Sequence, residues 1–166
     1  MKIIGIMGDA GSGKDTCADI IQRLMHDHNT TAARYSFACP IKRVAKEQFE
    51  WNGKKDEAGR QLLIDLGMIG RAYKRDLWLD KAVEYFRIWD APYGVVPDVR
   101  FANEYDYITQ NQGLIFRVVR PCVEPMDDES ERSLDGFLSH DVWVNRGSLE
   151  ELQQQVYSSM KQFGVI

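Results

Sequence analysis

Residues 1–21, MKIIGIMGDAGSGKDTCADII, contain the most informative motif of the chain. Gly8, Gly13 and Lys14 match G-x-x-x-x-G-K, in which backbone N–H groups surround phosphates and the lysine reaches the outer ones. The β-branched run at residues 2–7 predicts a strand buried on both faces, and apolar residues at helical spacing follow the glycines. Because the loop lies between a strand and a helix N-terminus, where anions bind, we interpret it as a phosphate-binding loop and not a chance glycine turn.

Composition limits the class of protein. The 166 residues are 44% apolar and 28% charged, which predicts one globular domain, residues 1–166. The net charge of −4 and the scattered basic residues argue against binding a nucleic acid polymer. No apolar run is long enough to span a membrane. Cys17, Cys39 and Cys122 lack disulfide or zinc spacing, so we expect reduced, mostly buried thiols in a cytoplasmic protein.

Strand and helix patterns alternate along the rest of the chain. Further strands are expected at residues 35–38, 95–101, 113–120 and 141–144. Helices are expected at residues 17–28, 40–51, 60–73, 77–89, 103–110 and 149–163, the last with a capping box from Ser148 and Glu151. This order predicts a three-layer α/β fold of the P-loop NTPase type, with a five-stranded parallel sheet and residues 2–7 as its central strand.

Candidate site residues follow the expected strands. In parallel sheets ligands bind beyond the carboxyl ends of the strands, where the glycine loop, Asp98, Arg120 and Asn145 are all expected. Phosphoryl transfer requires cations around the transferred group, so Lys14 and Arg120 are candidate catalytic residues. Arg120 in a salt bridge at the strand edge is the alternative. Asp98 either binds magnesium water or substrate, deprotonates an alcohol, or caps the following helix.

Asp15 stands where a Ser or Thr hydroxyl normally holds magnesium in such loops. Two interpretations remain open from the residues alone. Asp15 either points away in the first helical turn, which favours acids, and leaves Thr16 or waters on the metal, or it binds Mg²⁺ itself.

Four segments together show a family resemblance: SGKDT at 12–16, FACPIK at 37–42, DVRFANE at 98–104 and DVWVNRGSLEEL at 141–152. The sequence resembles the phage-type deoxynucleoside monophosphate kinases, a branch of the P-loop nucleoside monophosphate kinases. GKD is usual in that family, so Asp15 is expected there. The resemblance implies transfer of the γ-phosphoryl group of ATP, with Mg²⁺, to a small-molecule deoxynucleoside 5′-monophosphate. For a phage-encoded protein it implies the host cytoplasm.

The resemblance also implies roles for particular residues. Residues 38–94 resemble the helical monophosphate-binding insert, and residues 121–140 resemble the lid, in which Asp128 departs from the family pattern and Arg132 is a further basic candidate. The ATP phosphates are expected to contact Gly11, Ser12, Gly13, Lys14, Asp15 and Thr16. The acceptor is expected to contact Lys42, Arg71, Asp98, Arg100 and Glu104.

Several of these residues have simpler explanations. Arg100 and Glu104 are four residues apart and either form a surface ion pair or bind the acceptor phosphate and sugar. Arg71 is either a phosphate ligand or solvated helix surface. Trp78 lies off the apolar stripe that contains Trp89, so we interpret it as a possible base-stacking residue and Trp89 as core.

Three further questions stay open at this stage. Asn145 is placed either near the adenine of ATP or in a plain turn. The alternatives for function are another P-loop kinase, of the dephospho-CoA or phosphomevalonate type, and a nucleotide-binding switch module. A homodimer is possible, since apolar helix faces serve cores and dimer interfaces alike.

Overall fold

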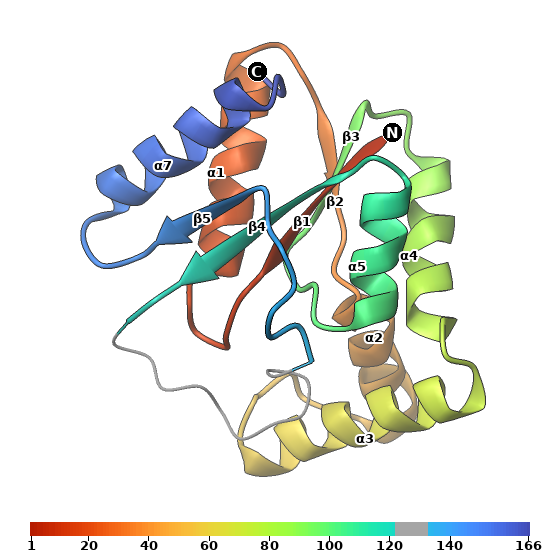
Figure 1. The fold of residues 1–166 in the computed structure, drawn as a ribbon. Helices are drawn as coiled ribbons and strands as arrows, with labels where there is room; N and C mark the ends of the chain where they lie inside the picture. Colours follow the sequence, from red (N-terminus) through yellow and green to blue (C-terminus); the bar gives the residue numbers. More distant parts are fainter. Residues whose placement is uncertain (122–132) are drawn as a thin grey trace. The chain divides into compact units, whose positions relative to one another are not determined.

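A computed structural model describes residues 1–121 and 133–166 of the chain (Figure 1). The chain divides into two compact units. The first unit comprises Met1–Arg34 and Trp89–Ile166, and the second comprises Tyr35–Ile88.

The first unit is built on a five-stranded sheet in which all pairs are parallel. Its strands are β1 (Lys2–Met7), β2 (Ala32–Arg34), β3 (Tyr93–Val96), β4 (Leu114–Val119) and β5 (Asp141–Val144). Their order in the sheet is β2-β3-β1-β4-β5 (Figure 1). The predicted five-stranded parallel sheet and the central position of residues 2–7 are therefore confirmed.

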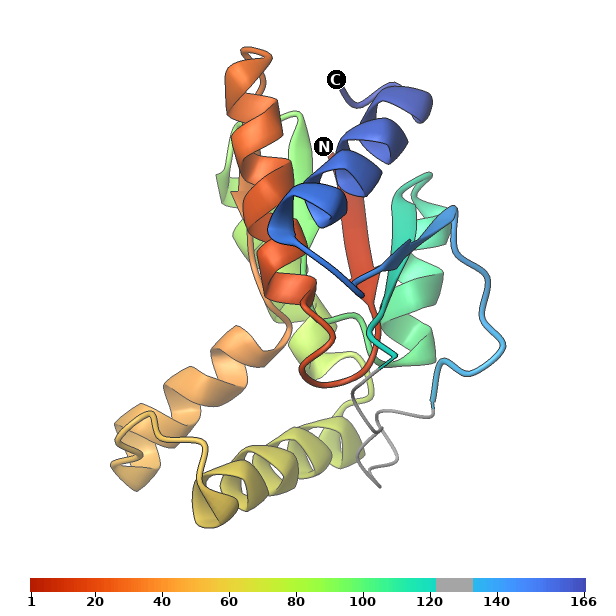
Figure 2. The same cartoon turned by 90° about the vertical axis from the view of Figure 1, so that its left-hand side faces the viewer.

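Helices cover both faces of this sheet. Helices α1 (Lys14–Asp27) and α7 (Leu149–Gln162) pack together on one face, and α5 (Ala102–Gln110) covers the other (Figures 1 and 2). Ile4 and Ile6 belong to the core beneath α1 and α7. Gly5 instead faces Ile108 of α5, because a Cβ there would lie 2.8 Å from the Ile108 Cδ1. This alternation along β1 gives the predicted three layers.

The β5 edge is fixed by a buried polar chain. The rings of Phe116 and Trp143 stack with centroids 4.7 Å apart. The Trp143 Nε1 donates to the Ser159 Oγ at 2.8 Å, and that hydroxyl donates to the Asp141 Oδ2 at 2.5 Å. These bonds join β5 to α7 and so fix the carboxyl end of β5, from which Asn145 follows.

The second unit contains α2 (Ala38–Phe49), α3 (Glu57–Tyr73) and α4 (Leu77–Ile88). Asp56 caps α3 by accepting the Gly59 N–H at 2.9 Å. The indole of Trp78 packs against α3, where a Cβ on Gly70 would lie 2.3 Å from the ring. Its Nε1 donates to the Gly67 carbonyl oxygen at 3.1 Å. Small residues on α3 thus let α4 approach closely.

Three sequence expectations about this region are wrong. The second strand is Ala32–Arg34 and not residues 35–38, because Ser36 accepts the N–H groups of Ala38 and Cys39 and starts α2 there. Helix α3 begins at Glu57, three residues early, since Asp56 caps it. Trp89 lies beyond the end of α4 and is 53% exposed.

The two cysteines that the structure describes differ in burial. Cys17 lies in the core and Cys39 is exposed, so the expectation of mostly buried thiols holds for Cys17 alone. Burial raises the pKa of the Cys17 thiol to about 12, which keeps it protonated and unreactive at neutral pH. Cys122 lies outside the described residues.

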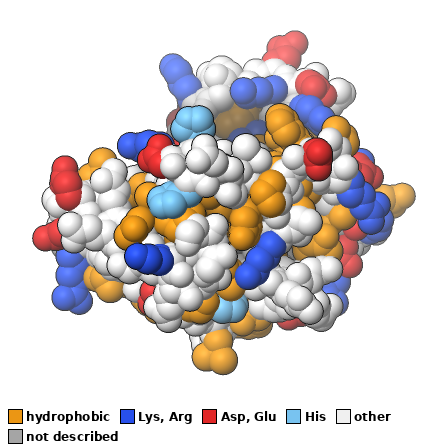
Figure 3. Space-filling view, turned by 90° about the horizontal axis from the view of Figure 1, so that it is seen from above, with side chains coloured by type: hydrophobic (Ala, Val, Ile, Leu, Met, Phe, Trp, Pro, Cys, Tyr) orange, Lys and Arg blue, Asp and Glu red, His pale blue; other side chains and the backbone are white. Residues whose placement is uncertain are grey.

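On the face in Figure 3, basic and acidic side chains are interspersed among apolar ones. Within residues 1–121 and 133–166, none of the helices combines the length and the apolar character needed to cross a bilayer.

Candidate functional site

The phosphate loop, residues 8–13, connects β1 to α1. Gly8 has φ 143°, and a Cβ there would lie 2.2 Å from the Val118 carbonyl oxygen. Gly13 has φ 108° and is the N-cap of α1. Both positions require glycine, because L-residues rarely adopt these angles and the backbone of β4 leaves no space beside Gly8.

Lys14 lies inside the phosphate loop. Its side chain is buried, and the Nζ donates to the carbonyl oxygens of Gly8 at 2.5 Å and Asp9 at 2.6 Å. An ammonium group held there stands at the N-terminus of α1, where the backbone also favours anions. The position suits a cation that binds the outer phosphates of a nucleotide.

Ser12 tests whether the loop fits a phosphate ligand. Its Oγ is buried and has no hydrogen-bond partner among the described residues. Native proteins rarely leave a buried hydroxyl unpaired. A phosphate oxygen would accept a hydrogen bond from the Ser12 hydroxyl, so the residues of the loop fit a nucleoside triphosphate.

Asn145 supports the loop from the end of β5. Its Nδ2 donates to the Ser12 carbonyl oxygen at 2.8 Å, and its backbone N–H bonds to the Val119 carbonyl at 2.8 Å. A Cβ on Gly13 would lie 2.7 Å from the same Nδ2. Asn145 therefore braces the phosphate loop, and a contact with adenine remains a prediction.

Two arginines leave β4 in different directions. The Arg120 Nη1 lies 3.5 Å from the Gly11 carbonyl oxygen and is exposed, so the structure brings Arg120 to the phosphate loop. The Arg117 Nη2 donates to the carbonyl oxygens of Leu134 at 3.0 Å and Phe137 at 3.2 Å. Arg117 thus serves packing of the segment that enters β5.

Asp15 forms an ion pair that the sequence analysis did not anticipate. Its Oδ1 lies 2.7 Å from the Arg34 Nη2, and the other terminal nitrogen of Arg34 bonds to Asp19. This geometry favours the first of the two interpretations of Asp15, in which the carboxylate points away from the metal. The sequence analysis missed this pair because it placed the second strand at residues 35–38, whereas Arg34 is the last residue of β2.

The expected metal residues are two neighbours in the first turn of α1, Asp15 and the half-buried Thr16. Within residues 1–121 and 133–166 no group of three or more His, Cys, Asp or Glu side chains could hold a metal. Magnesium in kinases usually takes only one or two protein ligands and completes its shell with phosphates and water. A Thr16 hydroxyl beside the phosphates fits that pattern.

The DVRFANE segment follows β3. The Val99 N–H bonds to the Ile6 carbonyl oxygen at 3.1 Å, which places Asp98 beside the carboxyl end of β1. Glu104 is buried, and its Oε2 accepts the N–H groups of Arg100 at 2.8 Å and Phe101 at 3.1 Å. Glu104 therefore holds the turn into α5 through the backbone. Ser133 also donates to the Arg100 carbonyl, a contact that sequence spacing could not reveal.

Three expected substrate residues lie in the second unit. Lys42 is half-buried on α2. Arg71 lies in the last turn of α3, and a Cβ on Gly67 would be 2.9 Å from its Nη2. Trp78 is only 8% exposed, so the expectation that it lies off the buried stripe is wrong. Its ring packs on Gly70 and is a core side chain of this unit.

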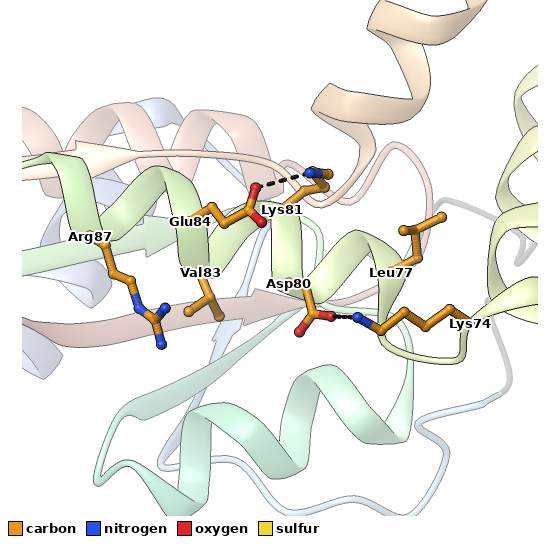
Figure 4. Close-up of a pocket in the computed structure, with 7 residues that line it drawn as sticks. All are labelled: Lys74, Leu77, Asp80, Lys81, Val83, Glu84 and Arg87. Atoms are coloured by element: carbon orange, nitrogen blue, oxygen red, sulfur yellow. Dashed lines mark hydrogen bonds and ion pairs between the residues drawn. The ribbon is translucent and has the colours of Figure 1, made fainter.

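A groove of about 200 Å³ also runs along α4 in the second unit (Figure 4). Its charged side chains are largely paired with one another. The Lys74 Nζ lies 2.5 Å from the Asp80 Oδ2, and Lys81 lies 3.0 Å from Glu84. The hydrogen bond that Lys74 donates to the Asp80 carboxylate raises the pKa of Lys74. None of the expected site residues lines this groove.

Comparisons with known proteins agree with this geometry. No protein-family model matches the chain. A protein of Acanthamoeba polyphaga mimivirus that carries the name deoxynucleotide monophosphate kinase is 30% identical over 95% of this chain and 95% of its own length. The deoxynucleoside-5′-monophosphate kinase of Escherichia phage T5 is 27% identical over 66% of this chain and 46% of that protein.

A solved structure supports the fold. Shikimate kinase from Acinetobacter baumannii matches with a TM-score of 0.54 and 11% identity, covering 100% of this chain and 96% of that one. At this identity the match concerns the fold alone, which is that of the P-loop kinases. The 30% identity to the mimivirus protein over 95% of both chains shows that this chain belongs to the deoxynucleotide monophosphate kinase family.

Proposed function

We propose that this protein transfers the γ-phosphoryl group of ATP to a deoxynucleoside 5′-monophosphate, giving ADP and the deoxynucleoside diphosphate. The observation that carries the proposal is the phosphate loop between β1 and α1. There the buried Lys14 and the Ser12 hydroxyl, which has no hydrogen-bond partner among the described residues, lie at a helix N-terminus. Membership of the family supplies the class of acceptor.

On the ATP side, backbone N–H groups of residues 11–16 would bind the phosphates, and Lys14 would stabilise charge on the transferred group. Arg120, which reaches the Gly11 carbonyl, would add a second cation as the γ-phosphoryl group moves. Thr16 would hold Mg²⁺, which when bound neutralises phosphate charge and orients the phosphates. Asp15 remains a metal candidate only if its ion pair with Arg34 opens.

On the acceptor side, the nucleophile is the phosphate of the monophosphate, whose second pKa is about 6. It is largely dianionic at neutral pH, so no side chain has to remove a proton. Asp98 would bind a magnesium-bound water or the substrate, and Arg100 would bind the acceptor phosphate through its planar fork. Glu104 would position Arg100 by holding its backbone.

We also propose that residues 38–94 form the monophosphate-binding insert, with Lys42 and Arg71 as phosphate ligands. This proposal is supported by the division of the chain, because most of that segment belongs to a compact unit of its own, Tyr35–Ile88. Residues 121–140 are proposed as the lid. Asp128 and Arg132 of that segment lie outside the described residues. We expect the protein to act in a cytoplasm. Whether it forms a homodimer can be tested by size-exclusion chromatography.

A coupled assay tests the proposal directly. The folded protein is incubated with MgATP and each of the four common deoxynucleoside monophosphates, and ADP release is followed. We expect release that depends on at least one of them. Release only with an added acceptor of another kind, an alcohol or a phosphate ester that is not a nucleotide, would support another P-loop kinase. Slow release that no acceptor stimulates would support a nucleotide-binding switch, and either result would overturn the proposal.

A further inference from the structure

Arg34 connects the edge of the sheet to the helix that carries the phosphate loop. It is the last residue of β2, the outer strand, and lies opposite Val95 of β3 in the parallel register. Its side chain is 25% exposed. The Nη2 lies 2.7 Å from the Asp15 Oδ1, and the Nη1 bonds to the Asp19 carboxylate.

One guanidinium therefore serves two carboxylates. Asp15 and Asp19 are four residues apart on α1, so they lie on the same helix face and repel each other. The two side chains are 85% and 55% exposed, whereas the cation between them is mostly buried. A planar guanidinium with two terminal nitrogens can pair with both at once, which a lysine ammonium does less well.

The position of Asp15 gives this bridge its importance. Asp15 directly follows Lys14 in the first turn of α1, so an unpaired carboxylate there would stand close to any phosphate in the loop. The charges of Asp15, Asp19 and Arg34 sum to −1, and without Arg34 they would sum to −2. Charges this close to a ligand are only partly screened, because the Debye length is about 8 Å at physiological salt.

We propose that Arg34 is a positioning residue for the nucleotide. It neutralises Asp15 and holds that carboxylate at the end of β2, so that the phosphate loop accepts a polyanion despite an acid beside its lysine. This inference rests on the proposed function, since it takes ATP to be the ligand of the loop. Arg34 is argued to act through Asp15 and not by touching the phosphates.

The expected effect of losing Arg34 on nucleotide binding is modest, because the Asp15 side chain is mostly exposed. Exposed ion pairs couple weakly, although a triphosphate multiplies the effect of one added charge. We expect Arg34→Met to weaken binding of MgAMP-PNP, a non-hydrolysable ATP analogue, by about 3- to 10-fold. The KM for ATP should rise by the same factor while kcat changes by less than about twofold.

The test is a double-mutant cycle read out by calorimetric titration of MgAMP-PNP into the whole protein. The variants are Arg34→Met, Asp15→Asn and the double variant. Arg23→Met is the matched control. Arg23 is an exposed arginine on α1 and lies about 12 Å beyond Asp15 along the helix axis. If Arg34→Met does not fold, Arg34→Gln replaces it, because its carboxamide can still donate to Asp15 but carries no charge.

Support requires that the loss caused by Arg34→Met falls below about twofold in the Asp15→Asn background, and that Arg23→Met binds like the original protein. An equal loss in both backgrounds would show that Arg34 acts without Asp15 and would overturn the inference. No loss from Arg34→Met would do so as well. Because binding is measured without an acceptor, failure of the kinase proposal would appear separately, as absent turnover by the unaltered protein.

Discussion

The phosphate loop and the helical unit Tyr35–Ile88 differ in what their residues do. In the loop, the backbone sets the geometry: three glycines have positive φ angles, and Lys14 and Asn145 bond to loop carbonyls. In the helical unit, Lys42 and Arg71 project from helices whose buried faces hold the unit together. Phosphate binding, as we propose it, is therefore built into the backbone, whereas the proposed acceptor binding depends on side chains that can vary.

The largest effect should come from the loop. Lys14→Met keeps the apolar stem and removes the charge, so kcat should fall by about 10²- to 10³-fold, as for loss of one transition-state donor. Steady-state kinetics at saturating ATP and acceptor measure this. The thermal midpoint serves as the control for folding. An unchanged kcat would show that Lys14 is not needed for phosphoryl transfer, and would contradict the role we assign to the loop.

The helical unit should affect only the acceptor. We expect Lys42→Met and Arg71→Met each to raise the KM for the monophosphate by about 10-fold or more, because each loses a charged contact to phosphate. The KM for ATP should change by less than about twofold. Arg43→Met, an exposed neighbour of Lys42 on α2, is the matched control. Equal changes in both KM values would contradict the division of roles.

Glu104 belongs to the first unit and, like the loop, acts on the backbone. Glu104→Ala leaves the N–H groups of Arg100 and Phe101 without their acceptor, so the free energy of unfolding should fall by about 1–3 kcal/mol. Denaturant unfolding measures the loss. Glu104→Gln keeps an acceptor oxygen and should lose less than half as much. Equal losses would show that charge and not the hydrogen bonds stabilises this turn.

The smallest effect should come from Trp78, whose indole lies in the core of the helical unit. Trp78→Phe loses the hydrogen bond to the Gly67 carbonyl and part of the ring, which should lower the free energy of unfolding by about 1 kcal/mol. Urea unfolding tests this. A rise in the KM for the monophosphate of one base alone, with an unchanged free energy of unfolding, would instead indicate that Trp78 stacks on the base.

The sequence predicted five parallel strands and the central one because the signals for them are local. It misplaced two strands, since those expected at 35–38 and 95–101 are Ala32–Arg34 and Tyr93–Val96 in the structure. The buried run at residues 2–7, the glycine motif and the capped helix after Ser148 each state their structure within a few residues. Motif position also placed Arg120 and Asn145 near the carboxyl edge of the sheet, and their contacts with loop carbonyls agree. Asp98 precedes Val99, whose N–H bonds to Ile6 of β1.

Other features depend on contacts between distant residues. Trp78 was misjudged although it shares helical spacing with the buried Ala82 and Phe86. Its contacts with Gly67 and Gly70 on α3 are what periodicity could not show. The ion pairs of Arg34 join residues nineteen and fifteen positions apart, and Ser133 reaches Arg100 across thirty-three. Periodicity cannot show such pairings, since they depend on which strand lies at the edge of the sheet.

The central claim is that one phosphoryl group passes from ATP to a deoxynucleoside monophosphate. Chromatographic separation of the nucleotides after reaction measures it most directly. We expect ADP and deoxynucleoside diphosphate to form in a one-to-one ratio, and to form only when both substrates are present. ADP formed with inorganic phosphate, and without the diphosphate product, would show that water is the acceptor and would contradict the account.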